Sequence, residues 1–137
     1  MNYENLLIEK KEYAYLKRII SASEYSSDTE SKKSLKKLGE ELSKSKVLDN
    51  TEIPKDIVRI NSLVTVSSEK GWSKTLQIVI PKEKNLIANK ISILTPMGSA
   101  LIGYSKGDEI IWDLPGGKQN LRIIDVVQGE QFDENNI

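Results

Sequence analysis

Three carboxylates that can take part in metal chemistry, Glu24, Asp28 and Glu30, fall close together in the sequence. Two carboxylates within reach of one another can complete the oxygen shell of a Mg²⁺ ion that another macromolecule already holds in part. Alone they would bind Mg²⁺ weakly, because this ion keeps several of its waters. In the alternative that we favour, the acids are solvated, and Asp28 and Glu30 stabilise the positive end of the following helix. Four nearby lysines would also weaken the attraction of these carboxylates for a metal cation: Lys32, Lys33, Lys36 and Lys37.

The sequence has no cysteine and no histidine. It therefore lacks a thiol nucleophile, a disulfide, a thiolate metal site, a Ser-His-Asp triad and an ordinary zinc site. We expect a protein that is not an enzyme and that has no catalytic residue, metal site or cofactor of its own. The 20 basic residues balance the 20 acidic ones. We therefore expect no strong direct binding to nucleic acid or to an anionic membrane.

The amino-terminal segment MNYENLLIEKKEY carries acids and lysines where a secretory signal has an apolar stretch. No apolar run in the sequence approaches the roughly 18 residues that cross a bilayer. From these two observations we expect a cytoplasmic protein, and we expect it to be a monomer.

Helical periodicity over residues 1–50 predicts a short antiparallel hairpin, or coiled coil. Apolar residues recur at helical spacing between Ile8 and Tyr25, and residues 26–29 then offer N-cap side chains for a second helix that ends near Lys46. Each arm would be about 25 Å long at 1.5 Å per residue. The second helix carries a single leucine stripe: Leu35, Leu38 and Leu42. Because this stripe is narrow, we expect the arms to bury mainly against each other; in the alternative, the hairpin packs on the rest of the chain as a lid.

Residues 51–137 are predicted to form a small α+β domain. A linker from Leu48 to Pro54 leads into it, and Pro96–Gly103 forms a short helical turn whose glycines, Gly98 and Gly103, permit its entry and exit dihedrals. We expect the tail, residues 129–137, to be frayed. Five β-branched segments are predicted strands: Ser62–Ser68, Thr75–Ile80, Lys90–Leu94, Glu109–Leu114 and Leu121–Val127, the last two joined at Pro115-Gly116-Gly117.

Several motifs in this second part, taken in order, resemble the carboxyl-terminal domain of the Gre family of transcript-cleavage factors. The run P-x-G-x-A-L-x-G spans Pro96–Gly103, Gly107-Asp108 follows it, and Pro115-Gly116-Gly117 precedes the last strand. Within the family, the sequence is most similar to the subgroup called regulator of nucleoside diphosphate kinase. This similarity comes from the segment Ile53–Ser62 and from Trp112, which stands before the glycine turn.

The resemblance implies an FKBP-like antiparallel β-sheet domain with one short helix, preceded by the coiled coil. Members of this family dock on RNA polymerase at its secondary channel, and acids at the tip of the coiled coil can help to hold a catalytic Mg²⁺ ion and water. The loop that matches the docking surface comprises Leu94, Thr95, Pro96, Met97 and Gly98. Met97 suits an exposed docking contact and a place in the core equally well.

The leading hypothesis is an RNA polymerase-binding regulator of transcription elongation that does not stimulate cleavage. Compared with the pattern of true cleavage factors, the predicted arms are shorter, and Asp28 and Glu30 lie two residues apart rather than three. One alternative is a cleavage-stimulating factor that uses these two carboxylates, with Mg²⁺ bound only in the context of the polymerase. A second alternative, which rests on the FKBP-like fold alone, is a peptidyl-prolyl isomerase or chaperone.

Overall fold

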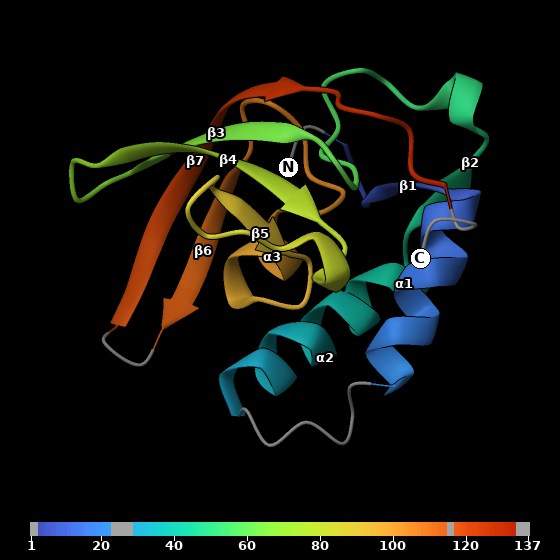
Figure 1. Cartoon of the computed structure of the whole chain (residues 1–137), viewed down its shortest axis with the longest axis horizontal. Coiled ribbons are helices and arrows are strands. Elements are labelled where there is room, and N and C mark those ends of the chain that lie inside the picture. The colour runs from blue at the N-terminus through green and yellow to red at the C-terminus, as the bar shows by residue number, and fades with distance from the viewer. Residues whose placement is uncertain (1–2, 23–28, 115–116, 134–137) are drawn as a thin grey trace.

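The computed structural model describes residues 3–22, 29–114 and 117–133, and its centre is a five-stranded sheet (Figure 1). The strands are β3 (Leu63–Ser68), β4 (Ser73–Val79), β5 (Lys90–Ser92), β6 (Glu109–Leu114) and β7 (Gly117–Val127). Their order across the sheet is β5-β4-β3-β7-β6. Neighbouring strands are antiparallel, except that the edge strand β5 runs parallel to β4.

The alternation of side chains along each strand explains which face of the sheet is buried. On β3, Val64 and Val66 are fully buried, whereas Leu63 on the opposite face is 42% exposed. All five predicted strands are confirmed, and β6 has the predicted ends. β7 begins at Gly117, earlier than predicted, because residues 117–120 continue the antiparallel ladder opposite residues 111–114 of β6.

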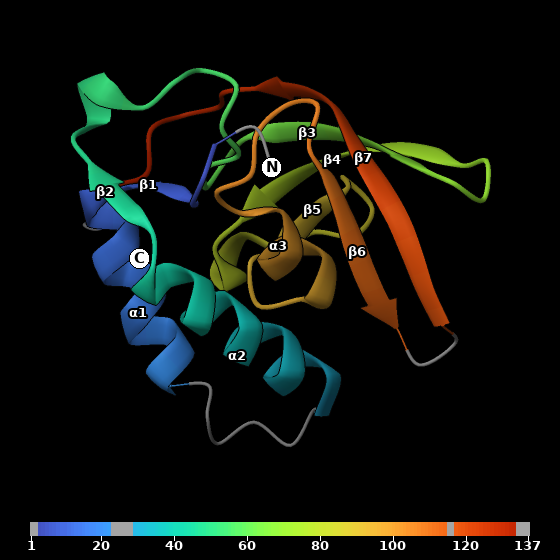
Figure 2. The same ribbon diagram turned by 180° about the vertical axis from the view of Figure 1, so that it is seen from behind.

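Two antiparallel helices precede the sheet, α1 (Lys10–Ala22) and α2 (Thr29–Ser43), which confirms the predicted hairpin (Figure 2). The predicted helix ends near Ile8 and Lys46 are wrong. These outer residues form a parallel two-stranded ladder instead, β1 (Leu7–Glu9) with β2 (Lys46–Leu48). The Glu9 carboxylate accepts hydrogen bonds from the backbone N–H groups of Lys11 and Glu12, and α1 therefore starts directly after β1.

The hairpin lies on the rest of the chain and is not supported by its own contacts alone. One hydrophobic core contains Leu16 of α1 and Leu38 of α2 together with Val64 and Ile123 of the sheet. α2 also packs against α3 (Pro96–Leu101), as both ribbon views show. The whole predicted leucine stripe is buried: Leu35, Leu38 and Leu42. Of the two arrangements that the sequence allows, the structure therefore shows the one in which the hairpin packs on the sheet domain.

The carboxyl-terminal tail was predicted to be frayed, and for residues 129–133 this prediction is wrong. Phe132 is only 6% exposed, and its ring centre lies 4.9 Å from that of Tyr15 on α1. Gly129 approaches Asn61 so closely that a Cβ at position 129 would overlap the Asn61 carbonyl oxygen. This tail therefore joins α1 to the sheet by hydrophobic burial, which a stretch of acidic and amide residues does not suggest.

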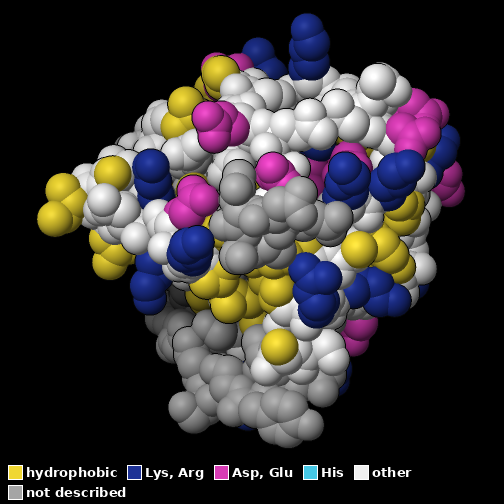
Figure 3. Space-filling model, turned by 45° about the vertical axis from the view of Figure 1, so that its right-hand side comes forward, with side chains coloured by type: hydrophobic (Ala, Val, Ile, Leu, Met, Phe, Trp, Pro, Cys, Tyr) yellow, Lys and Arg dark blue, Asp and Glu magenta, His cyan; other side chains and the backbone are white. Residues whose placement is uncertain are grey.

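Two single-turn 3₁₀ helices complete the described secondary structure, η2 (Asn50–Glu52) in the predicted linker and η3 (Pro81–Glu83) after β4. On the face that carries α1, basic side chains stand beside acidic and hydrophobic ones and form no continuous basic stripe among the residues drawn in colour (Figure 3). Over the described ranges, none of the helices has the length and apolar character that a bilayer crossing requires.

Candidate functional site

The segment that leads into α3 is fixed by its own hydrogen bonds. Thr95 is the N-cap: its Oγ1 accepts a hydrogen bond from the Gly98 N–H at 3.1 Å and donates one to the Ser92 carbonyl at 2.7 Å. Pro96 occupies the first turn, where its missing N–H costs nothing. Leu94, Thr95 and Pro96 are half-exposed. These three are the members of the predicted docking loop that a partner can contact directly.

The other two members of the predicted loop face inward. Met97 is 9% exposed and belongs to the hydrophobic core, so the core interpretation of this residue is confirmed. Gly98 is buried, and a Cβ there would overlap the carbonyl oxygen of Ser92. Its role is therefore close backbone packing. The positive φ that was expected for a flanking glycine occurs at Gly103, at 85°.

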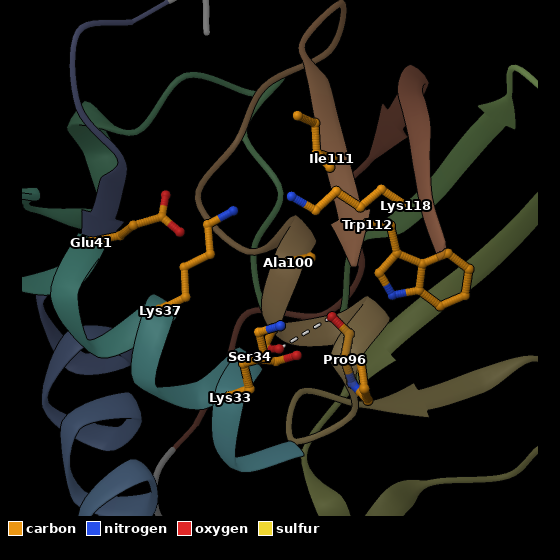
Figure 4. Close-up of a pocket in the computed structure, with 10 residues that line it drawn as sticks. Lys33, Ser34, Lys37, Glu41, Pro96, Ala100, Ile111, Trp112 and Lys118 are labelled. Atoms are coloured by element: carbon orange, nitrogen blue, oxygen red, sulfur yellow. Dashed lines mark hydrogen bonds between the residues drawn. The ribbon is translucent and has the colours of Figure 1, made fainter. Parts of the chain in front are cut away.

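A groove of about 270 Å³ lies where α2, α3 and the β6–β7 hairpin meet, and Pro96 forms part of its wall (Figure 4). Lysines outnumber acids along it. In Figure 4, Lys37 of α2 and Lys118 of β7 extend over the groove from opposite sides. The complete lining is Lys33, Ser34, Lys37, Glu41, Pro96, Ser99, Ala100, Ile111, Trp112 and Lys118. The groove therefore presents a positive rim.

The floor of the groove is apolar. Ile111 is 55% exposed there, and Trp112 is half-buried beside it. The Trp112 ring packs edge-on against Trp72, with 6.4 Å between ring centres. The Trp112 indole nitrogen is buried and has no hydrogen-bond partner among the described residues. An apolar floor under a lysine rim suits a segment that carries both a hydrophobic side chain and carboxylates.

The single glutamate of the groove is already engaged. The Tyr104 hydroxyl donates a 2.6 Å hydrogen bond to Glu41 Oε2, which ties α2 to the loop after α3. Burial, together with this carboxylate, raises the pKa of Tyr104 well above its usual value. The phenol therefore stays protonated and acts as a donor at physiological pH. Glu41 keeps its negative charge, so the groove carries one acid against three lysines, Lys33, Lys37 and Lys118.

A buried ion pair fastens α1 to the segment before β3. The Arg59 Nε donates to Glu12 Oε2 at 2.8 Å, and the backbone N–H of Ile60 donates to Glu12 Oε1 at 2.9 Å. The two side chains are 4% exposed for Glu12 and 15% for Arg59. Burial raises the pKa of Glu12, while the neighbouring Arg59 acts in the opposite direction. Sequence reasoning did not find Glu12, whose acidic type predicts an exposed helix position.

The side chains of the predicted tip acids lie outside the part of the chain that the structure describes. Glu24 and Asp28 lie outside the described residues, and Glu30 belongs to the first turn of α2, where only its backbone is described. Their role therefore stays a prediction. Within the described part of the chain, no cluster of three or more acidic side chains is placed to hold a metal ion.

Comparisons with known proteins converge on one family. The family model described as "Transcription elongation factor, GreA/GreB, C-term" matches residues 53–128. A transcription elongation factor GreA of Syntrophus aciditrophicus is 36% identical over 93 residues, which cover 67% of this chain and 58% of that protein. A regulator of nucleoside diphosphate kinase of Escherichia coli K12 is 33% identical over 81 residues, or 58% of this chain and 60% of that protein. The chain thus spans about three fifths of the length of these curated relatives.

Among solved structures, similarity extends over almost the whole chain. The prokaryotic transcription elongation factor GreA/GreB of Nitrosomonas europaea is 32% identical and superposes with a TM-score of 0.73. The match covers 91% of this chain and 99% of that one. Because the coverage exceeds the sheet domain, the similarity includes the helical hairpin as well.

Proposed function

This chain belongs to the GreA/GreB family of transcription elongation factors, and from that premise we propose that it binds RNA polymerase and regulates elongation without stimulating transcript cleavage. The observation that carries the proposal is the family match over residues 53–128, which contains the sheet, α3 and the predicted docking loop. In this proposal the protein acts as a cytoplasmic monomer. It brings no cofactor of its own, and any Mg²⁺ ion belongs to the polymerase.

The groove between α2, α3 and the β6–β7 hairpin is the docking surface in this proposal. Pro96 is the one of the three half-exposed loop residues that lines the groove, and Ile111 offers a further apolar surface in its wall. Lys37 and Lys118 give the rim its charge. A polymerase segment with an apolar side chain between carboxylates fits this groove, because hydrophobic burial supplies affinity and the charges favour the correct orientation.

The short, attached hairpin supports a regulator that does not stimulate cleavage. The 13 residues of α1 and the 15 residues of α2 give arms of about 20 Å and 22 Å at 1.5 Å per residue. The Glu12–Arg59 ion pair and the Glu41–Tyr104 hydrogen bond hold both arms to the domain. A hairpin of this length and attachment covers the mouth of the secondary channel in our proposal, and its tip does not reach the active centre.

Affinity for core RNA polymerase of the same organism tests the docking surface. The double variant Lys37→Glu/Lys118→Glu reverses the rim charge, and we expect it to bind at least about tenfold more weakly, a loss of about 1.4 kcal/mol. Lys74→Glu, a single reversal at an exposed position of β4, is the control and retains affinity. If the wild-type protein does not bind the polymerase, the proposed function is wrong.

Backtracked elongation complexes test the second part of the proposal. We expect the purified protein to bind these complexes without shortening the nascent RNA. Magnesium-dependent shortening that is lost in Asp28→Ala would establish the cleavage-factor alternative instead. A known cleavage factor added to the same complexes is the positive control, and it shows that the transcripts can be cleaved.

A further inference from the structure

The strand β6 forms one edge of the sheet, so only one of its two sides is paired within the chain. It lies at the end of the strand order β5-β4-β3-β7-β6 and pairs with β7 alone (Figure 2). On the open side of an edge strand, every second residue has an N–H and a C=O without a partner in the sheet. Ile111 and Trp112 of β6 also line the groove. The open edge and the proposed docking surface therefore share residues.

Hydrogen bonds of β7 show which residue of β6 turns its backbone outward. Ile111 lies opposite Asn120, but the Asn120 carbonyl accepts from the Glu69 N–H at 3.1 Å, on the other side of β7. The Ile123 N–H donates to the Asp108 carbonyl at 2.9 Å. Because hydrogen-bonded pairs alternate along an antiparallel ladder, both observations direct the N–H and C=O of Ile111 to the open edge. Among the described residues, no backbone hydrogen bond from outside the sheet reaches Ile111.

The outward backbone of Ile111 determines the shape of the segment that suits the groove. A helix uses its N–H and C=O groups internally except at its ends, so the side of a helix cannot pair with this backbone. An extended segment carries such groups along its side and can add to β6 as a further strand. Ile111 is 55% exposed, so the edge is accessible to such a segment.

The side chains around this edge determine the composition of the segment. Lys33, Lys37 and Lys118 line the groove together with one acid, Glu41. Successive side chains of a strand point to opposite faces, so an added strand can direct one set of residues to the apolar floor and the other set to the lysine rim. This arrangement favours a segment in which apolar and acidic residues alternate. A second copy of the chain would bring an identical lysine rim against this one and is disfavoured by the repulsion.

We propose that an extended segment of RNA polymerase, in which apolar and acidic residues alternate, pairs with the open edge of β6 through the backbone of Ile111. The inference rests on the proposed function, since it specifies the shape of the segment that occupies the proposed docking surface. Backbone pairing supplies affinity that does not depend on the side chains of the segment. The apolar floor and the lysines then select its sequence.

Affinity of full-length variants for core RNA polymerase tests backbone pairing at Ile111. Ile111→Pro removes the outward N–H and no hydrogen bond to β7, because proline is tolerated where the N–H of an edge strand faces outward. The matched variant Ile111→Ala leaves a smaller side chain than proline but keeps the N–H. Thermal unfolding of both variants shows whether the fold is retained. Hydrogen–deuterium exchange of the wild-type protein, with and without polymerase, reports on the Ile111 amide without any substitution.

We expect Ile111→Pro to bind at least about tenfold more weakly than Ile111→Ala, a difference of about 1.4 kcal/mol. In the complex, the Ile111 amide should exchange more slowly than in the free protein, because it gains an acceptor. If wild type binds the polymerase and the two variants bind equally well, strand pairing is overturned while the proposed function stands. An Ile111 amide that exchanges at the same rate in the free and the bound protein also overturns it, whether or not the variants fold. Failure of the wild-type protein to bind refutes both proposals.

Discussion

Replacing Glu12 with alanine tests whether a buried ion pair holds the hairpin to the sheet domain. The wild-type carboxylate accepts hydrogen bonds from Arg59 Nε at 2.8 Å and from the Ile60 N–H at 2.9 Å. Glu12→Ala leaves the Arg59 guanidinium without its charge partner and the buried Ile60 N–H without an acceptor. Both groups then carry a desolvation cost that the folded protein no longer offsets.

The expected loss of unfolding free energy follows from the burial of the pair. Removing one partner of a buried ion pair costs about 3–5 kcal/mol. We expect the lower end, about 3 kcal/mol, for two reasons. Arg59 keeps a second hydrogen bond, from its Nη1 to Asn50 Oδ1 at 2.9 Å. The raised pKa of Glu12 also shows that burial already offsets part of the attraction between the charges.

Urea unfolding at pH 7, followed by tryptophan fluorescence and circular dichroism, measures this loss. The matching variants are Arg59→Met and the double variant Glu12→Leu/Arg59→Met. We expect the double variant to lose less stability than the sum of Glu12→Leu and Arg59→Met, because it leaves no unpaired buried charge. A Glu12→Ala variant within about 0.5 kcal/mol of wild type, or additive single losses, would refute the reasoning.

Three further predictions concern stability. Because burial raises the pKa of Glu12, the folded state binds more protons than the unfolded chain just above the ordinary value of 4.5. The free energy of unfolding, measured at a series of pH values, should therefore fall as the pH rises through that window. Glu12→Gln should remove this contribution to the pH dependence. Gly98→Ala should cost about 1–3 kcal/mol, since its Cβ meets the Ser92 carbonyl; Gly39→Ala, with nothing nearer than 3.9 Å, should be neutral or stabilising. Phe132→Ala should cost about 3–5 kcal/mol in urea unfolding, whereas a frayed tail would lose nothing.

The elements that could be predicted from the sequence are those specified by local patterns. Leu35, Leu38 and Leu42 repeat with helical spacing, and the structure buries all three on α2; Leu38 and Leu42 belong to the hydrophobic core. Thr95 before Pro96 is a local helix-start signal, and Thr95 does cap α3. Such signals lie within a few residues of the structure that they specify. The fold class was therefore accessible from the sequence, whereas the docking role of residues 94–98 stays a prediction.

The contacts that escaped prediction join residues far apart in the chain. Glu12 looks like any exposed helical acid, because its partner Arg59 is 47 residues away. Phe132 stands among acidic and amide residues, and its partner Tyr15 lies on α1. The groove likewise depends on Lys118, which only tertiary packing brings across from Lys37. Local propensity carries no information about such partners.

The groove exists only while the hairpin is docked, because one of its walls is α2. Undocking would carry Lys37 away from Lys118 and would leave Pro96 and Ile111 on an open surface. In our proposal, the Glu12–Arg59 and Glu41–Tyr104 contacts therefore also influence polymerase binding, although Glu12 does not line the groove. In our proposal the hairpin completes the docking surface that its own domain begins. A hairpin used in this way has a structural reason to be short, since an arm held along the domain cannot also extend far from it.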